Sequence, residues 1–168
     1  MNKRFVGMAV LAAGLLFYCP KVEAAGYSEI GQYGRSGILV TEDTEEQIQE
    51  EIRLGELELL ALLVEAEAGN QPFEGKCLVV DCVLNRVESD NFPDSISEVI
   101  YQEGQFSVVK NGGLDKAGWT ITESDYAAVM YEVELHQNRQ VLYFNNCAIV
   151  AGTGSKFQVG NQWFRGEG

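Results

Sequence analysis

One glutamate in this sequence interrupts the apolar face of a predicted helix, and it is the residue best placed to do chemistry. Leu57, Leu60 and Val64 recur at helical spacing, and Glu67 continues the same stripe. Apolar neighbours and the negative end of the helix dipole both disfavour the carboxylate anion, so we expect a raised pKa for Glu67. A carboxyl group that keeps its proton near neutral pH can act as a general acid. The structural alternative is a helix-end carboxylate that merely reaches solvent or accepts a capping bond.

The neighbouring carboxylates are weaker candidates for the same chemistry. Glu58 and Glu65 lie on the opposite side of the helix, on the face predicted to meet water. Glu74 suits a capping position as the third residue of the next helix, and Asp81 lies at least one turn farther along. The sequence therefore offers one carboxylate for catalysis rather than a pair.

Two consecutive helices would position Glu67. The first is predicted from about Thr44 or Glu45 to Ala68, and a turn at residues 69–70 ends it. A second, buried helix is predicted from Pro72 to Val87. Because the turn is short, the end of the first helix must lie against the start of the second.

The second half of the chain mixes short helices with a few strands. A loop over residues 89–94 precedes a short helix with apolar residues at Ile96, Val99 and Ile100. Residues 104–109 are predicted to form a strand, followed by a turn or loop at Gly112 and Gly113.

The last part of the chain is expected to contain one more helix and two extended segments. A capping box at Thr122 and Asp125 introduces a helix over residues 126–135. Its predicted apolar stripe consists of Tyr126, Val129, Met130 and Val133. Residues 141–145 and 156–164 are predicted to be extended, so the fold class is α+β and mostly helical, with a small β hairpin or sheet.

The first 24 residues have the order of a secretory signal peptide. Lys3 and Arg4 precede an uncharged apolar run over residues 5–18, and small residues lead to a predicted cleavage site after Ala24. The run is short for a membrane span, which needs about 20 apolar residues. Cys19 could instead mark a lipoprotein, but two bulky aromatic residues precede it where lipid attachment needs small ones.

After the signal peptide, the chain divides into a tail and a single domain. Residues 25–43 are glycine-rich and lack an apolar period, which predicts a flexible N-terminal segment. Residues 44–168 have the length of one domain and contain no repeat.

Composition limits the partners and cofactors of this domain. The net charge of -13 becomes two charges more negative when residues 1–24 are removed, so nucleic acid and anionic membranes are poor partners. His136 is the single histidine and there is no CxxC motif, so neither a metal site nor a cofactor is expected. Cys77 and Cys82 are too far apart along one helix to form a disulfide, so at least one thiol of the exported chain must stay free unless it pairs with another chain.

Four segments, taken together and in order, resemble the SleB-type cell wall hydrolases, which include spore cortex-lytic enzymes. The segments are EAEAGNQPFEGKCLVVDCVLNRV, NFPDSISEVIYQEGQFSVV, VLYFNN and VGNQWF, within residues 57–164. The resemblance implies a fold similar to lysozyme-like lytic transglycosylases and action on the glycan strands of peptidoglycan. It also implies that Glu67 is the catalytic acid and base.

The sequence departs from the family pattern in two places. Gly69, Asn70 and Gln71 stand where the pattern commonly has Arg-Gly-Glu, and Gln162 stands where it commonly has histidine. Neither departure removes Glu67, the expected acid, but either could alter substrate binding or local stability.

The chemistry implied is cleavage between N-acetylmuramic acid and N-acetylglucosamine. With one carboxylate, the C6 hydroxyl of the muramic acid can attack and give a 1,6-anhydro product, which we favour over hydrolysis. By analogy with the lysozyme-like hairpin, two groups of residues would line the groove: Gln105, Phe106 and Ser107 on one strand, and Tyr143 and Asn145 on another. A secreted or wall-located monomer with no stable membrane span is expected.

An alternative from a different class is a catalytically silent protein of the same fold that binds peptidoglycan or a partner. The loss of the common arginine, glutamate and histidine at positions 69, 71 and 162 favours it, whereas the retention of Glu67 disfavours it. Metallopeptidase and thiol-peptidase interpretations are weaker, because the sequence lacks a zinc set and a recognisable cysteine nucleophile.

Overall fold

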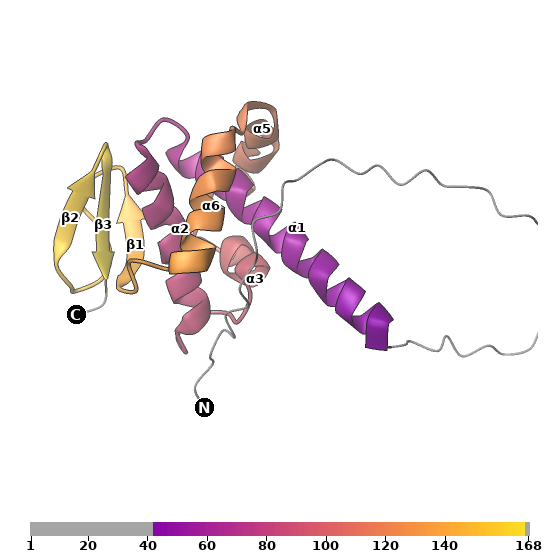
Figure 1. The fold of residues 1–168 in the computed structure, drawn as a ribbon. Helices are drawn as coiled ribbons and strands as arrows, with labels where there is room; N and C mark the ends of the chain where they lie inside the picture. The colour runs from indigo at the N-terminus through magenta and orange to yellow at the C-terminus, as the bar shows by residue number, and fades with distance from the viewer. Residues whose placement is uncertain (1–41, 167–168) are drawn as a thin grey trace, which may run out of the picture.

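The computed structural model describes residues 42–166, which contain six helices and a three-stranded sheet (Figure 1). The predicted signal peptide lies outside the described residues, as does the predicted flexible segment apart from Glu42 and Asp43, which are helical. The helices are α1 (Glu42–Ala68), α2 (Phe73–Glu88), α3 (Ile96–Tyr101), α4 (Ser107–Lys110), α5 (Gly113–Thr120) and α6 (Glu123–Leu135). The strands are β1 (Val141–Asn145), β2 (Lys156–Val159) and β3 (Gln162–Gly166).

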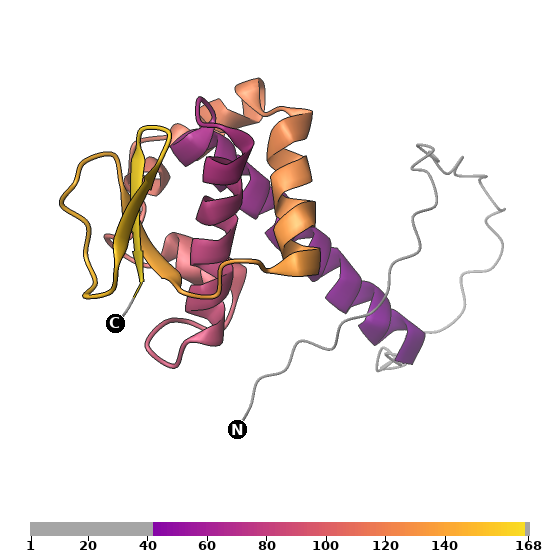
Figure 2. The ribbon, with the colours of Figure 1, turned by 60° about the vertical axis from the view of Figure 1, so that its left-hand side comes forward.

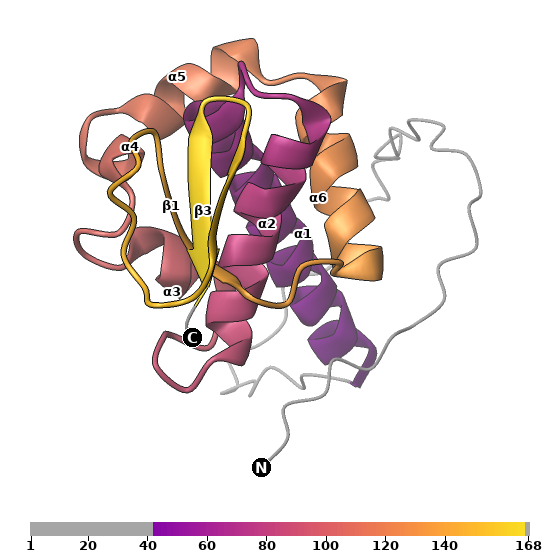
Figure 3. The same ribbon diagram turned by 90° about the vertical axis from the view of Figure 1, so that its left-hand side faces the viewer.

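Helix α2 is the centre of the fold. Its residues from Gly75 to Val87 are all buried, because other elements cover it on every side. Figure 3 shows α2 between α6 and the sheet, with α1 behind it. Leu60, Leu63 and Val64 of α1 are fully buried, and each such side chain contributes about 1.5–3 kcal/mol. The predicted α1 and α2 and the apolar stripe that leads to Glu67 are confirmed.

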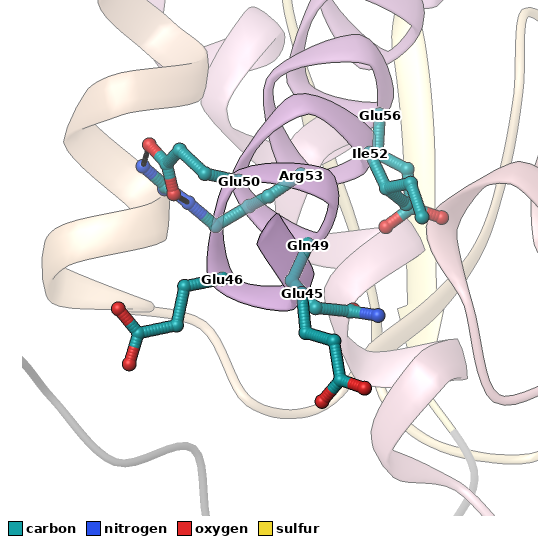
Figure 4. Close-up of a pocket in the computed structure, with 7 residues that line it drawn as sticks. All are labelled: Glu45, Glu46, Gln49, Glu50, Ile52, Arg53 and Glu56. Carbon is teal, nitrogen blue, oxygen red and sulfur yellow. Dashed lines mark hydrogen bonds and ion pairs between the residues drawn. The ribbon is translucent and has the colours of Figure 1, made fainter. Parts of the chain in front are cut away.

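The N-terminal half of α1 projects beyond the rest of the domain (Figure 1). Ile48, Ile52 and Leu54 there are 45%, 53% and 54% exposed. Figure 4 shows the side chains of this part spreading from one helix, with Arg53 and Glu50 joined at 2.7 Å. Since no other element contributes to this surface, it is an exposed helix face rather than an enclosed cavity.

The sheet is antiparallel, in the order β1-β3-β2, and it packs on α2 through β1. Phe164 of β3 is fully buried and contacts the rings of Phe144 and Phe157. The extended segment predicted over residues 156–164 is a hairpin, because Gly160, at a φ of 56°, turns the chain between β2 and β3. The fold class, mostly helical with a small sheet, is confirmed.

The predicted strand over residues 104–109 is wrong. Gly104 has a φ of 80° and lies in a turn, and the residues from Ser107 onward form α4. A short apolar run cannot by itself distinguish a strand from a buried helical turn. The same region contains the helix that the sequence did not predict, α5, which Gly112 precedes in a left-handed conformation.

Helix α6 has the predicted capping box, but the wrong face was assigned to the core. Asp125 accepts a hydrogen bond of 2.8 Å from the Thr122 amide. Of the predicted stripe, Val129 is buried, whereas Tyr126, Met130 and Val133 are exposed. The buried face also includes Asp125 and Glu132, and these carboxyl groups are tolerated there because they are paired. Asp125 forms an ion pair of 2.7 Å with Lys76 of α2, and Glu132 accepts a bond of 2.8 Å from the amide of Gln137.

Cys77 and Cys82 are buried free thiols in α2, and Cys147 is an exposed one. This confirms that Cys77 and Cys82 do not form a disulfide. Among residues 42–166, no helix is both long enough and apolar enough to cross a membrane.

Candidate active site

A hollow of about 660 Å³ opens at the C-terminal end of α1. Figures 2 and 3 show the tip of the β2–β3 hairpin beside the turn that joins α1 to α2. The residues that line the hollow come from the end of α1, the turn after it, the loop after β1 and the hairpin, and they are Glu65, Ala66, Glu67, Gly69, Asn70, Gln71, Asn146, Asn161 and Gln162.

Glu67 lies in the last turn of α1 and lines this hollow, with a half-buried side chain. Burial raises the pKa of its carboxyl group above the usual value, because a partly desolvated anion loses hydration. The direction predicted from the sequence is therefore confirmed. A carboxyl group with this property, open to a hollow, has the physical requirements of a general acid.

Gln162 ties the hairpin to the backbone of Glu67. Its Nε2 donates a hydrogen bond of 2.9 Å to the Glu67 carbonyl oxygen. The side chain is 4% exposed, and its Oε1 has no hydrogen-bond partner among the described residues. The residue that replaces the family's common histidine thus holds the end of α1 in place and brings a buried acceptor to the wall of the hollow.

Gln71 makes a second connection between the same two elements. Its Oε1 accepts a hydrogen bond of 2.8 Å from the amide of Asn161, and its Nε2 donates to Oδ1 of Asn70. A Cβ at Gly160 would lie 2.8 Å from Pro72, so the hairpin approaches the turn as closely as a glycine allows. The neutral amide at position 71 therefore has a structural role that uses both its donor and its acceptor.

Glu65 is not placed as the sequence predicted. It is half-buried and lines the same hollow as Glu67, so the expectation that it points away into water is wrong. Its carboxyl group lies over Gly69, where an added Cβ would come within 2.8 Å of Glu65 Cδ. The helical wheel fails here because α1 ends at Ala68, and a long side chain can extend past the end of a helix over a residue that has no side chain.

None of the five residues predicted to bind substrate lines the hollow. Gln105 and Ser107 are exposed around the start of α4, and Asn145 is exposed at the end of β1. Phe106 is 5% exposed and packs against Phe144. Their role as substrate contacts elsewhere along a groove stays a prediction.

The two aromatic residues of that set, Phe106 and Tyr143, pack around the buried guanidinium group of Arg86. The guanidinium of Arg86 lies 5.1 Å from the ring centroid of Phe106 and 5.7 Å from that of Tyr143. A third ring, that of Phe92, also lies at 5.1 Å, and Arg86 Nε donates to the Leu142 carbonyl at 2.9 Å. These contacts favour a structural role for Phe106 and Tyr143.

Asn146 and Asn161 line the hollow and were not singled out from the sequence. They are distant in sequence from each other and from Glu67, and an isolated asparagine carries no signal of its location. The VGNQWF segment was noted for Gln162, which is the neighbour of Asn161. Within residues 42–166, no three histidine, cysteine or acidic side chains gather closely enough to hold a metal ion.

Comparison with known proteins identifies relatives of this chain. Spore cortex-lytic enzymes from Oceanobacillus iheyensis and Bacillus subtilis are each 37% identical to it over 59 residues, which is 35% of this chain. That stretch is 21% of the first relative and 19% of the second. The chain therefore matches about a fifth of the length of these curated relatives.

Two solved structures share the fold. The catalytic domain of the Bacillus cereus SleB protein has a TM-score of 0.55 and 26% identity, over 66% of this chain and 88% of that domain. The catalytic domain of the germination-specific lytic transglycosylase SleB from Bacillus anthracis has a TM-score of 0.54 and 24% identity, over 66% of this chain and 93% of that domain. The expected SleB-like fold is confirmed.

The sequence profile of one family, described as Cell Wall Hydrolase, matches residues 70–165. The match covers α2 to β3 and includes Gln162, and it begins three residues after Glu67. It extends over more than half of the chain, and the chain belongs to this cell wall hydrolase family.

Proposed function

We propose that this protein cleaves the glycan strands of peptidoglycan between N-acetylmuramic acid and N-acetylglucosamine, with Glu67 as the catalytic residue. The observation that carries the proposal is a half-buried carboxyl group with a raised pKa, in the wall of a hollow, on the fold of the SleB catalytic domains. The name of the family and those of its relatives support the substrate class.

The proposed reaction begins with proton transfer. Glu67 donates its proton to the glycosidic oxygen, and the bond between that oxygen and C1 of the muramic acid breaks. The C6 hydroxyl of the same sugar then attacks C1, and the Glu67 carboxylate accepts the hydroxyl proton. The products are a free 4-hydroxyl group on N-acetylglucosamine and a 1,6-anhydro end, and Glu67 is again protonated.

The other side chains of the hollow suit a sugar substrate. Five of the residues that line it carry amides, namely Asn70, Gln71, Asn146, Asn161 and Gln162. An amide can both donate to and accept from hydroxyl and acetamido groups, so it can orient a neutral sugar without contributing charge. Gln105, Phe106, Ser107, Tyr143 and Asn145 remain proposed contacts for sugars beyond the hollow.

Peptidoglycan lies outside the cytoplasmic membrane, so the proposed activity requires export. We propose that residues 1–24 direct secretion and that the remainder acts at the cell wall as a monomer. The basic, apolar and small-residue order of residues 1–24 supports this localisation.

Digestion of purified sacculi by the exported protein tests the proposal. We expect turbidity to fall, and we expect mass spectrometry to find new muropeptides with 1,6-anhydro ends. The competing candidate is a silent glycan-binding protein of the same fold, which would bind the sacculi without releasing fragments. Gln71 and Gln162 weigh against this candidate, because these departures from the family pattern form hydrogen bonds that assemble the hollow.

A further inference from the structure

We propose that Glu65 is a second catalytic residue of this hollow, a base that activates water, so that part of the cleaved product carries hydrolysed reducing ends. The inference rests on the proposed function, since it concerns the fate of the same sugar after Glu67 has protonated the leaving oxygen. It adds a role for a carboxylate that the helical pattern places on the water-facing side of α1.

The position of Glu65 carries the inference. Glu65 and Glu67 both belong to the last turn of α1, both are half-buried, and both line the same hollow. Residues two apart on an ideal helix point in nearly opposite directions. Here the helix ends one residue after Glu67, and the Glu65 side chain lies against Gly69, beyond the helix end.

Gly69 is what makes room for the Glu65 carboxyl group. A Cβ at position 69 would lie 2.8 Å from Glu65 Cδ and 2.6 Å from the backbone carbonyl oxygen of Glu65, closer than real Cβ contacts allow. Any residue other than glycine would therefore force both the carboxyl group and the backbone at the end of α1 to shift. Gly69→Ala therefore displaces the proposed base without removing it, but it also disturbs the helix end that carries Glu67, so it supports the test and does not decide it alone.

Among residues 42–166, no cation forms an ion pair with the Glu65 carboxylate. None of the residues that line the hollow is basic, and no ion pair among the described residues includes Glu65 or Glu67. A carboxylate in a salt bridge would be a weaker base, because the cation stabilises its charge. The amide side chains of Asn70 and Asn161 share the hollow with Glu65 and can hold a water molecule by hydrogen bonds.

The chemistry parallels that of a two-carboxylate glycosidase. Glu67 gives its proton to the leaving oxygen, and the bond from that oxygen to C1 breaks. The oxygen of a water molecule bonds to C1 while Glu65 accepts one proton from that water. The products are a reducing muramic acid end and a free hydroxyl group, and exchange with solvent restores the proton on Glu67 and removes it from Glu65.

Product analysis separates the two routes, because borohydride reduces a hydrolysed end and leaves a 1,6-anhydro end unchanged. We would digest sacculi with the wild type, with Glu65→Gln and with Gly69→Ala, reduce the products and quantify both ends by mass spectrometry. Glu58→Gln is the matched control, since Glu58 is an exposed carboxylate on the same helix and does not line the hollow. Thermal melts would confirm that each variant is folded.

The wild type and Glu58→Gln are expected to give both kinds of end. In Glu65→Gln the ratio of reducing to 1,6-anhydro ends should fall by about 10²-fold or more, the usual contribution of a general base. Gly69→Ala should lower the same ratio, and it should have no further effect on the ratio when combined with Glu65→Gln.

Two results would overturn the inference: a wild type that forms 1,6-anhydro ends alone, or a ratio that Glu65→Gln and Gly69→Ala leave unchanged. If Glu65→Gln does not fold, the ratio in Glu65→Asp decides: aspartate keeps a carboxylate on a side chain one methylene shorter, and the ratio should fall. A failure of the proposed function looks different, because the wild type would then release no glycan fragments of either kind.

Discussion

Two carboxyl groups of this chain, those of Glu67 and Asp81, have raised pKa values because of burial. Burial raises the pKa of Glu67, which faces the hollow. It also raises the pKa of Asp81 to about 8, and the neighbouring Glu132 adds to the effect by its charge and a hydrogen bond. Asp81 and Glu132 are 1% and 2% exposed, between α2 and α6. Glu67 belongs to the proposed chemistry, whereas the Asp81–Glu132 pair affects the stability of the fold.

Asp81→Asn is expected to flatten the pH dependence of stability. The raised pKa means that folded Asp81 stays protonated up to about pH 8, whereas unfolded Asp81 ionises near pH 4. The unfolded state therefore binds fewer protons in this window, and the free energy of unfolding falls as pH rises through it. Asparagine cannot ionise and can still accept from the Asn138 amide, so at pH 7 the variant should be more stable by about 1 kcal/mol or more. Thermal melts from pH 5 to pH 9 measure the effect.

Asp90→Asn is the control for that comparison, because Asp90 is exposed in the loop after α2. It should leave the slope of stability against pH unchanged. An Asp81→Asn variant whose slope matched that of the wild type would show that Asp81 does not carry the buried proton.

Gln162→Ala is expected to weaken both stability and catalysis. The change removes the donor to the Glu67 carbonyl, and loss of a partner from a buried acceptor costs about 1–3 kcal/mol. If Gln162 positions Glu67, kcat should fall more than KM rises, because the substrate contacts remain. Gln49→Ala removes an exposed amide of α1 that does not line the hollow, and it should alter neither the stability nor the ratio of kcat to KM. An unchanged kcat in Gln162→Ala would leave Gln162 with a structural role alone.

At the scale of elements, α6 shows where hydrophobic periodicity misleads. Its buried face combines Val129 and Ala128 with Asp125 and Glu132, while Met130 is 55% exposed. The buried carboxyl groups are accommodated because α2 presents Lys76 and Asp81 toward this helix. A single helix does not reveal which polar residues its neighbours will pair.

Val129→Ala and Met130→Ala form a matched test of that assignment. Val129 is 1% exposed, so its truncation should cost about 2 kcal/mol through lost burial and a residual cavity. Met130→Ala should change stability by less than about 0.5 kcal/mol, as is usual for an exposed site. Urea unfolding of the two variants measures both values. The opposite order of costs would mean that the face predicted from the sequence is the one that packs.

The sequence predicted the elements whose apolar residues follow one clear period. The helices α1 and α2 and the strand β1 have such local signals, and the capping box at Thr122 and Asp125 marks the start of α6. The predicted strand over residues 104–109 and the omission of α5 are errors in a region of short elements around Gly104 and Gly112, where local signals are ambiguous.

The site was predictable to the extent that it depends on one helix. Glu67 follows from the stripe of α1, and its raised pKa follows from the apolar neighbours. The positions of Asn146 and Asn161 in the hollow depend on tertiary packing. The position of the Glu65 side chain depends on the end of α1, where Gly69 leaves room for it. These are contacts that no periodic pattern encodes.

At the scale of the whole molecule, the domain is a helical body with α2 at its centre and a small sheet on one side (Figure 3). The hollow lies where the sheet's hairpin meets the end of α1, and two amide side chains, Gln71 and Gln162, join the two parts there. The proposed active site therefore depends on the docking of the hairpin as much as on the helix that carries Glu67.

The exported protein is expected to begin at Ala25. The sequence of residues 1–24 motivates this prediction, since its basic start, apolar run and small residues suit cleavage by signal peptidase. N-terminal sequencing or intact mass of the protein from the culture medium or wall fraction gives the answer. A mature protein that still carried Met1 would contradict it, and a lipid-modified Cys19 would favour a lipoprotein.

The measurement that tests the central claim most directly is the rate of glycan cleavage by Glu67→Gln on purified walls. Glutamine keeps nearly the volume of glutamate but has no acidic proton, so the fold should persist while the rate falls by about 10² to 10⁴-fold. Thermal melts should show a midpoint equal to or above that of the wild type, since a partly desolvated carboxyl group is replaced. Glu58→Gln, the exposed control on the same helix, should keep the wild-type rate. Wild-type cleavage by Glu67→Gln would contradict the account, and Glu65, the other carboxyl group that lines the hollow, would then be the next acid to test.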